Sequence, residues 1–417
     1  MIETNDDLLT ARDKGIPARA IGMTASDFLA TAPRLDEFWT PLVVLDDAAM
    51  RANVATMTAW CGERGLQLMP HGKTTMAPEL WQRQLDAGAL GITLATMGQV
   101  RTGRDAGLDS IMLANCAVDP RSLAWLAGEL ADPDFRFVCW ADSLAVVDAM
   151  EHALRDIELP RPIDVCVELG ADGGRTGARS VDAAMQVAQR LAASDVLRLA
   201  GVAGYEGSLA HDRSAQGLAA VRTYLEEQLA LHQALAPLYD DGELYVSAGG
   251  SAYFEIVAEV WSAAERDDRT HFTLRSGAYI VHDDGFYRGI SPFDEGGTAD
   301  GPRFVNAMHG IARVVSSPEA GLALVDAGKR DFPYDEGLPI PRATAAEIDA
   351  EWRPLDATLS AMNDQHSYVR SEEPLAVGSV VRFGLSHPCT AFDKWRVLPV
   401  VDDLASGVVT GLIRTWF

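Results

Sequence analysis

The chain has 417 residues, of which 48% are hydrophobic and 23% are charged, as is typical of a globular protein with a large core. Its 35 basic and 60 acidic residues give a formal net charge of −25, which argues against nucleic acid or an anionic membrane as a partner. The sequence has no amino-terminal signal pattern, no long apolar stretch of the kind that spans a membrane, and five scattered cysteines. We therefore expect a cytoplasmic protein with two domains, or one barrel with an appendage.

The first 40 residues are polar and irregular, apart from a helix-like patch near Ala25–Ala30. We predict that residues 1–40 form an extension that packs on a β domain. Pro41–Leu45 is predicted to be a strand, and the aspartates that follow it can cap a helix that runs to about Arg64.

A regular alternation of strand-like and helix-like segments comes next. The strand-like runs are mostly continuously apolar, as expected for parallel strands that are buried on both faces. They are Leu66–Pro70, Ile92–Thr96, Ile111–Asn115, Phe135–Trp140, Ile163–Leu169, Leu197–Tyr205, Leu244–Ser247 and Phe272–Arg275. Eight such runs joined by helices predict an α/β fold with a closed (β/α)8 barrel over residues 41–285, and an open doubly wound sheet is the alternative.

The pattern changes after about Gly285, where Gly, Pro and Asp become frequent and helix signals become few. Short β-like runs follow at Val305–Val315, Leu322–Ala327, Val377–Phe383, Trp395–Val401 and Gly407–Ile413. One helix-like segment, Ala343–Trp352, interrupts them. Residues 286–417 are therefore predicted to form a separate, mostly antiparallel β domain.

Lys73 follows the apolar run Leu66–Pro70 and precedes a helix-like stretch. The carboxyl ends of the strands are where barrel enzymes hold their chemistry. Apolar surroundings lower the pKa of a lysine amine, which can then react as a free amine and typically forms a Schiff base. Most lysines are solvated surface charges, so this residue alone is a weak signal.

Two glycine-containing segments follow the last two predicted strands. The first holds Ser247, Gly249 and Gly250, and it can either cradle a phosphate before a helix or form an ordinary turn. The second, Arg275–Tyr279, can close the same phosphate site, because many barrels bind phosphate at their last two strand ends.

Three further residues follow strand-like runs. Arg175 lies in a long glycine-rich loop that either points it into a site or lies on the surface. Tyr205 ends the sixth run and can line a pocket. His211 can serve as a general base, although the charged residues Asp212 and Arg213 beside it indicate an exposed turn.

His387 and Cys389 form an i, i+2 pair, which places both side chains on one face of an extended segment. Imidazole and thiolate suit zinc. Two ligands are too few for a structural site, so a bound metal would keep open positions for water or substrate. From these residues alone, an unrelated histidine and cysteine remain the favoured interpretation.

Taken together, these segments resemble the motifs of the D-serine dehydratase / D-threonine aldolase family. This family comprises fold-type III pyridoxal-phosphate (PLP) enzymes that are related to alanine racemase. The resemblance runs from about Thr40 to the carboxyl terminus in the family's order. The segments that carry it are Pro70–Thr74, Tyr205–Ser208, Ser247–Gly250, Arg275–Tyr279 and His387–Cys389.

The resemblance implies that Lys73 forms the Schiff base with PLP and moves the α-proton, and that Tyr205 lines the ring pocket. It implies that His387 and Cys389 hold a divalent metal that binds the substrate's β-hydroxyl. By ligand type this metal is Zn²⁺, with Mn²⁺ as the alternative. The phosphate would be held by Gly249, Gly250, Gly277, Ala278 and Tyr279. The family members are homodimers that act on a small amino acid.

Two lyase reactions remain open. Dehydration of a β-hydroxy D-amino acid to a keto acid and ammonia is favoured, because the His-x-Cys pair fits that branch best. The amino-terminal extension and the Glu168–Gly177 loop also resemble the bacterial amino acid deaminases. In the aldolase branch a catalytic histidine follows the pocket tyrosine by six residues, as His211 follows Tyr205, so cleavage to glycine and an aldehyde is the alternative. However, Glu206 stands where aldolases usually have histidine. An amino-acid racemase is less favoured because it needs no metal, and the small PLP-homeostasis proteins lack the β domain.

Overall fold

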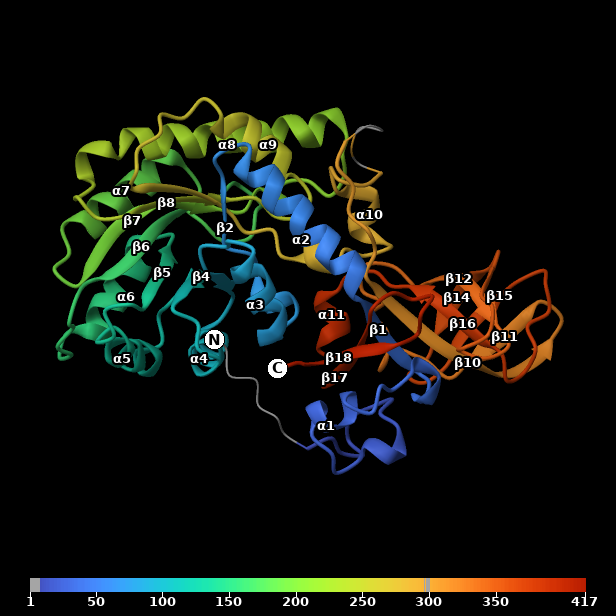
Figure 1. Ribbon diagram of the computed structural model, residues 1–417. Coiled ribbons are helices and arrows are strands. Elements are labelled where there is room, and N and C mark those ends of the chain that lie inside the picture. Colours follow the sequence, from blue (N-terminus) through green and yellow to red (C-terminus); the bar gives the residue numbers. More distant parts are fainter. Residues whose placement is uncertain (1–7, 296, 298–300) are drawn as a thin grey trace. The chain divides into compact units, whose positions relative to one another are not determined.

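The computed structural model describes residues 8–295, 297 and 301–417, so the first seven residues of the expected extension lie outside the described residues. The chain divides into two compact units. The first contains Thr58–Lys73 and Arg83–Gly277, and the second contains residues 8–57, Thr74–Gln82 and Ala278–Phe417. The helices α2 (Asp47–Gly62) and α3 (Pro78–Asp86) each contain a boundary between the units (Figure 1).

The first unit contains an 8-stranded sheet in which every paired strand is parallel to its neighbour. Its order is β2-β9-β8-β7-β6-β5-β4-β3, and a bridge between His71 and Thr93 joins the two ends. The strands are β2 (Gln67–Leu68), β3 (Ile92–Leu94), β4 (Ser110–Cys116), β5 (Arg136–Ala141), β6 (Ile163–Leu169), β7 (Leu197–Gly204), β8 (Leu244–Ala248) and β9 (Thr270–Leu274). The structure contains all eight predicted strands. It confirms the predicted barrel rather than the open doubly wound sheet, which was the alternative.

The helices of this unit lie outside the strands (Figure 1). They are α4 (Met97–Asp105), α5 (Pro120–Glu129), α6 (Leu144–Leu154), α7 (Val181–Ala192), α8 (Ala215–Ala234) and α9 (Phe254–Trp261). Five of them begin at a Ser, Thr or Asp whose side chain accepts a backbone N–H of the first turn, which satisfies a donor that has no partner within the helix. Inside the barrel, large side chains such as Met112, Trp140 and Tyr245 form one buried cluster, so the interior is packed.

The second unit contains a 10-stranded sheet. All its pairs are antiparallel except β1–β17, which confirms the predicted mostly antiparallel β region. The strands are β1 (Leu42–Asp46), β10 (Met308–Glu319), β11 (Leu322–Val325), β12 (Ile340–Ala345), β13 (Arg353–Pro354), β14 (Thr358–Met362), β15 (Ser367–Arg370), β16 (Val380–Gly384), β17 (Val397–Val401) and β18 (Val409–Arg414). The short helices are α1 (Ala25–Leu29), α10 (Phe286–Ile290) and α11 (Cys389–Phe392).

Two details differ from the expected organisation. The barrel was expected to begin at residue 41. However, β1 pairs with β10 and β17, so this strand belongs to the second sheet and not to the barrel. The predicted helix Ala343–Trp352 is wrong, because β12 and β13 pair across this segment. Ala343–Ala345 belongs to β12, which pairs with β13 on one side and with β16 on the other, and residues 346–352 connect β12 to β13.

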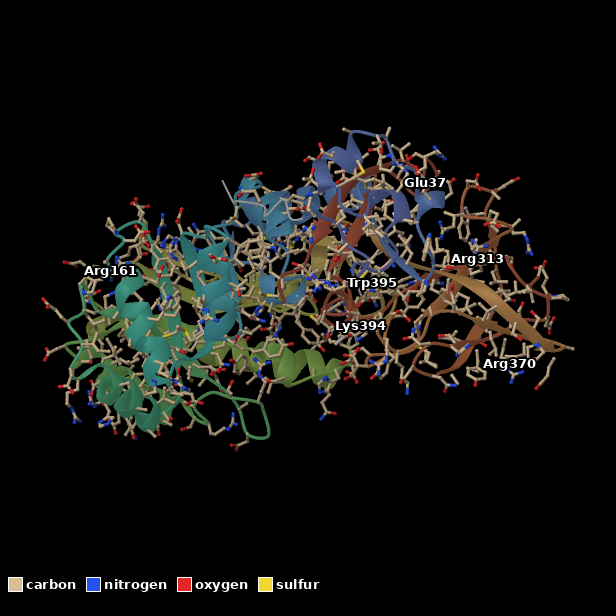
Figure 2. All side chains as sticks on the ribbon, turned by 90° about the horizontal axis from the view of Figure 1, so that it is seen from below. Glu37, Arg161, Arg313, Arg370, Lys394 and Trp395 are labelled. Carbon is tan, nitrogen blue, oxygen red and sulfur yellow. The ribbon has the colours of Figure 1, made fainter. Side chains whose placement is uncertain are left out.

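Residues 8–40 share one hydrophobic core with the second sheet. Leu9, Phe28 and Phe38 are buried in the same cluster as Ile311 and Leu412. Polar contacts add to it. Lys14 Nζ lies 4.1 Å from the ring centre of Trp395, which is labelled in Figure 2. The Trp395 Nε1–H donates to the Asp331 carbonyl at 2.8 Å. Among the residues described, no helix combines the length and the apolar character needed to span a membrane.

Candidate active site

The strand ends of the barrel bring together several residues that the sequence singled out. All its strands are parallel, so their carboxyl ends lie at one edge. Lys73 lies in a 3-10 turn, Gly72–Thr74, soon after β2, and Tyr205 follows β7 directly. Arg175 lies in the loop after β6, is exposed, and places its guanidinium 4.8 Å from the centre of the Tyr205 ring.

Several basic groups lie at this edge, and the acids Glu168 and Glu206 interact with one of them, Arg275. The pKa of His71 lies well below its ordinary value, first because of burial and then because of the positive charges of Lys73, Arg275 and Arg175. His71 Nδ1 and Arg275 Nε are buried and, within the part of the chain that the structure describes, have no hydrogen-bond partner. Unpaired buried polar atoms among positive charges fit an anionic ligand, and the phosphate and phenolate of PLP meet that requirement.

Arg275 was not singled out individually by the sequence analysis. It is 2% exposed, donates from Nη1 to Ser247 Oγ at 2.7 Å and from Nη2 to the Gly204 carbonyl at 2.5 Å, and covers the Trp140 ring at 4.7 Å. The signal that could have identified it is the one used for Lys73, a basic residue at the end of an apolar strand.

The backbone amides of the glycine segment after β8 already donate to a carboxylate within the protein. The backbone N–H groups of Gly249 and Gly250 donate to Glu206 at 3.0 and 2.6 Å, and Glu206 is 0% exposed. Ser276 Oγ donates to the Gly249 and Gly250 carbonyls at 3.1 and 2.9 Å, which fixes the other side of the turn. These two amides, which the sequence assigned to a phosphate, therefore have a partner within the protein.

Gly277 follows β9 where two backbone segments meet. A Cβ at this position would lie 2.5 Å from the His71 carbonyl oxygen, so only glycine fits. Ala278 and Tyr279 begin the next 3-10 turn in the second unit and are 4% and 2% exposed. His211 is exposed in the bend that precedes α8.

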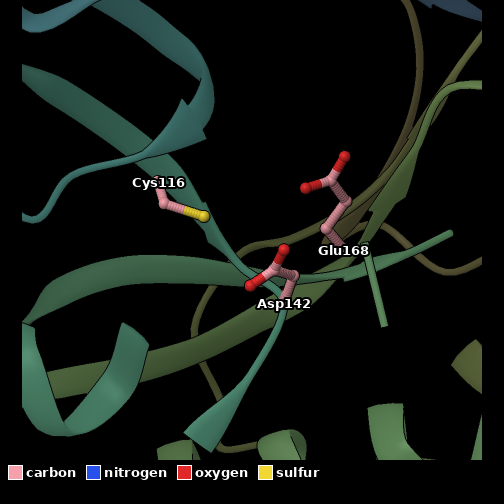
Figure 3. A group of neighbouring side chains, drawn as sticks. All are labelled: Cys116, Asp142 and Glu168. Carbon is pink, nitrogen blue, oxygen red and sulfur yellow. The ribbon is translucent and has the colours of Figure 1, made fainter. Parts of the chain in front are cut away.

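One cluster at the barrel edge escaped the sequence analysis. Cys116 at the end of β4, Asp142 after β5 and Glu168 in β6 each place a metal-binding atom within 4.8 Å of the others (Figure 3). Cys116 is only partly buried. Burial first, and then the two carboxylates, raise the pKa of its thiol to about 12, so the thiol is protonated near neutral pH. Three separate strands create this cluster, which no local pattern reveals.

The carboxylates of this cluster also anchor the loop that carries Arg175. Thr176 Oγ1 donates to Glu168 Oε1 at 2.6 Å, and the Gly177 N–H donates to Asp142 Oδ2 at 3.2 Å. The pKa of Glu168 is raised, first by burial.

His387 and Cys389 come together in the second unit, although not in the way that was expected. His387 has a left-handed backbone with φ of 51°, and Cys389 begins α11, so the segment is a turn rather than an extended run. The hydrogen bond with Cys389, followed by the acid Asp335, raises the pKa of His387 to about 9. The Cys389 thiol donates to Thr74 Oγ1 at 3.4 Å.

The His387–Cys389 pair fits a divalent metal. Asp335 Oδ2 lies 2.5 Å from His387 Nδ1, so Nδ1 is engaged by the carboxylate and Nε2 is the nitrogen that a metal could bind in exchange for a proton. A neighbouring thiol completes a nitrogen and sulfur donor set of the kind that binds zinc. Asp335 lies 52 positions before His387, and the sequence analysis missed it.

The chain is similar to several known proteins. Residues 307–401 match the family model of the serine dehydratase domain. A D-threonine aldolase from Arthrobacter sp is 29% identical over 372 residues, which cover 87% of this chain and 89% of that protein. The crystal structure of D-threonine aldolase from Filomicrobium marinum has a TM-score of 0.76 at 25% identity and covers 91% of this chain and 96% of its own.

A third similar protein is D-threo-3-hydroxyaspartate dehydratase from Delftia sp. (strain HT23), which is 29% identical over 170 residues, 40% of this chain and 44% of that protein. Solved structures of a dehydratase of this name include a variant with a histidine changed to alanine, with a TM-score of 0.73 at 21% identity, covering 94% of this chain and 98% of its own. Another variant has the cysteine two positions later changed to alanine. It is in the metal-free form and has a TM-score of 0.72 at 22% identity, covering 92% of this chain and 99% of its own.

Proposed function

Because this chain is homologous to D-threonine aldolase and D-threo-3-hydroxyaspartate dehydratase and carries a serine dehydratase domain, we propose that it is a PLP-dependent, metal-assisted lyase of β-hydroxy D-amino acids. Between the two lyase reactions we favour dehydration, which releases a keto acid and ammonia. We further propose that the protein is cytoplasmic, as its scattered cysteines suggest, and that it is a homodimer, as the family resemblance implies.

The observation that carries the dehydratase proposal is the spacing of His387 and Cys389. The same two residue types stand two positions apart in the D-threo-3-hydroxyaspartate dehydratase, whose cysteine variant is metal-free. Here the two side chains are joined by a hydrogen bond, which supports a shared metal. By ligand type we propose Zn²⁺, with Mn²⁺ as the alternative.

The basic groups at the barrel edge support the cofactor part of the proposal. When bound, PLP supplies an electron sink for the substrate's α-carbon, and the metal polarises the β-hydroxyl as a leaving group. In this proposal the Lys73 amine holds the cofactor and takes the proton from the α-carbon. Tyr205 and Arg175 would contact the cofactor, and Arg275 would contribute buried positive charge to its site.

The phosphate contacts are proposed for the turn Gly277–Tyr279, together with Ser247. Gly249 and Gly250 can contribute their N–H groups only if Glu206 releases them. A phosphate beside the Glu206 carboxylate would be repelled, so binding would favour that displacement.

Aldol cleavage to glycine and an aldehyde is the second candidate. It is favoured by the D-threonine aldolase similarity, which covers 87% of this chain, and by His211, six positions after Tyr205. The exposure of His211 leaves it accessible to a substrate hydroxyl, as a general base requires.

Product analysis tests both candidates. The purified protein, supplied with PLP and Zn²⁺, is incubated separately with D-serine, D-threonine and D-threo-3-hydroxyaspartate. A keto acid with ammonia establishes dehydration, and glycine with an aldehyde establishes aldol cleavage. If none of the three yields either product pair, the proposed function is wrong.

A further inference from the structure

The imidazole of His387 is held in place through its side chain by Asp335. Asp335 Oδ2 accepts from His387 Nδ1 at 2.5 Å, and Asp335 Oδ1 accepts from Thr390 Oγ1 at 2.6 Å. The same threonine hydroxyl lies 3.3 Å from the His387 carbonyl oxygen. One carboxylate therefore bridges the two ends of the turn His387–Thr390 and holds the imidazole ring of His387 in place.

The backbone of His387 is held by a second carboxylate, Asp283. The His387 N–H donates to Asp283 Oδ2 at 2.9 Å. Asp283 Oδ1 accepts from the N–H groups of Gly285 and Tyr287 at 3.1 and 2.8 Å, and Asp283 is 0% exposed. Two backbone N–H groups of its own turn therefore hold the Asp283 carboxylate in place while it accepts the His387 N–H.

The hydrogen bond to Asp283 stabilises an otherwise unfavourable backbone conformation of His387. Its φ of 51° lies in the left-handed region, which a residue with a Cβ adopts only when its surroundings impose it. The two segments also touch closely. A Cβ on Gly285 would lie 2.3 Å from Ser386 Cβ, and the Asp284 N–H donates to the Leu385 carbonyl at 3.0 Å.

We infer that Asp335 and Asp283 are positioning residues for a metal ligand: Asp335 fixes the tautomer and direction of the His387 imidazole, and Asp283 fixes its backbone. The inference rests on the proposed metal role of His387 and Cys389. A carboxylate on the far nitrogen of a metal-binding histidine fixes the orientation of the ring, directs Nε2 to the metal and makes it a better donor, and losing such a partner typically weakens metal affinity about 10–100-fold.

Zinc affinity, measured by competition with a chromophoric chelator, tests this inference without any assay of activity. We expect Asp335→Ala to weaken zinc binding about 10–100-fold. Asp335→Asn keeps an oxygen that can accept from Nδ1, so it should recover part of that loss. Asp283→Asn presents an amide N–H₂ to the His387 N–H and should also weaken binding, because two donors then face each other.

Two controls separate positioning from general damage. Asp364→Asn changes a carboxylate whose side chain is 72% exposed and should bind zinc like the wild type. The visible spectrum of the cobalt-substituted protein reports ligand geometry directly, and Asp335→Ala should shift it while the circular dichroism stays unchanged. If Asp335→Ala fails to fold, Asp335→Asn provides the comparison.

The outcomes distinguish the inference from the function on which it rests. If the wild type binds zinc and all three variants bind it equally well with an unchanged cobalt spectrum, the positioning role is wrong and the lyase proposal stands. If the wild type itself binds neither zinc nor cobalt, the metal part of the proposed function fails, and the positioning role fails with it.

Discussion

Thr74 and Cys389 are 315 positions apart in the chain, yet the Cys389 thiol donates to Thr74 Oγ1 at 3.4 Å within the second unit. Thr74 is the residue that follows Lys73. Lys73, the proposed cofactor lysine, is therefore bonded directly to the residue that contacts Cys389, a proposed metal ligand. Because different side chains hold the cofactor and the metal in this proposal, we expect that each can be removed without the other, and the first two predictions follow from this.

Cys389→Ala should lose bound zinc and lyase activity and retain PLP, because it removes one of only two proposed protein ligands. Metal analysis and the visible absorbance of the same sample measure both quantities. Cys116→Ala is the matched control and should keep its zinc. If Cys116→Ala loses zinc while Cys389→Ala keeps it, the metal belongs to the cluster of Cys116, Asp142 and Glu168 instead.

Lys73→Ala should abolish the visible absorbance of covalently held PLP and reduce activity to background, while zinc remains bound. Lys329→Ala, a lysine beside Tyr334 in the second unit, should change neither quantity. Absorbance and metal analysis on dialysed protein provide the measurement. An unchanged spectrum in Lys73→Ala would refute the cofactor assignment.

His211→Ala should spare dehydration and reduce aldol cleavage about 10²–10⁴-fold, the usual contribution of a general base. The comparison requires kcat/KM for both product pairs on the same preparation. His366→Ala changes another exposed histidine and should leave both rates unaltered. Equal losses of the two reactions in His211→Ala would remove His211 as the residue that separates the branches.

Glu206→Gln should lower the free energy of unfolding by about 1–3 kcal/mol, because the amide can accept from only one of the Gly249 and Gly250 N–H groups and leaves the other buried without a partner. Urea unfolding of the protein without cofactor measures the effect. Glu265→Gln, at an exposed position, is the control. A Glu206 variant as stable as this control would show that the glycine turn does not depend on the carboxylate.

His232 should make the protein less stable in mild acid. Burial lowers its pKa to about 4, and its Nδ1 lies 3.0 Å from the hydroxyl of Tyr239. The unfolded chain therefore binds more protons than the folded protein between about pH 6.5 and 4, so stability falls as the pH drops through this range.

His232→Gln should reduce the loss of unfolding free energy between pH 7 and pH 5 by on the order of 1 kcal/mol. His152→Gln, on the exposed side of α6, should follow the wild type. Urea unfolding at the two pH values provides the test, and identical pH dependence in the His232 variant and the wild type would contradict it.

The barrel could be predicted from the sequence because its signals are local. Each buried parallel strand is a continuous apolar run, and residues such as Ser143 and Ser180 cap the helices that follow. The position of Lys73 follows from the same pattern, since a residue after an apolar run in such a chain lies at the carboxyl edge of the barrel.

The sequence by itself determined the eight barrel strands, the mostly antiparallel region after them and the residue types able to bind PLP and a metal. Only the tertiary structure decided the partners of these residues: Glu206 on the glycine amides, Asp335 and Asp283 on His387, and β1 in the second sheet. The physical reason is the sequence separation over which each kind of interaction acts. Periodicity and caps act over a few residues, whereas these contacts join positions that lie tens to hundreds of residues apart and form only when the sheets assemble.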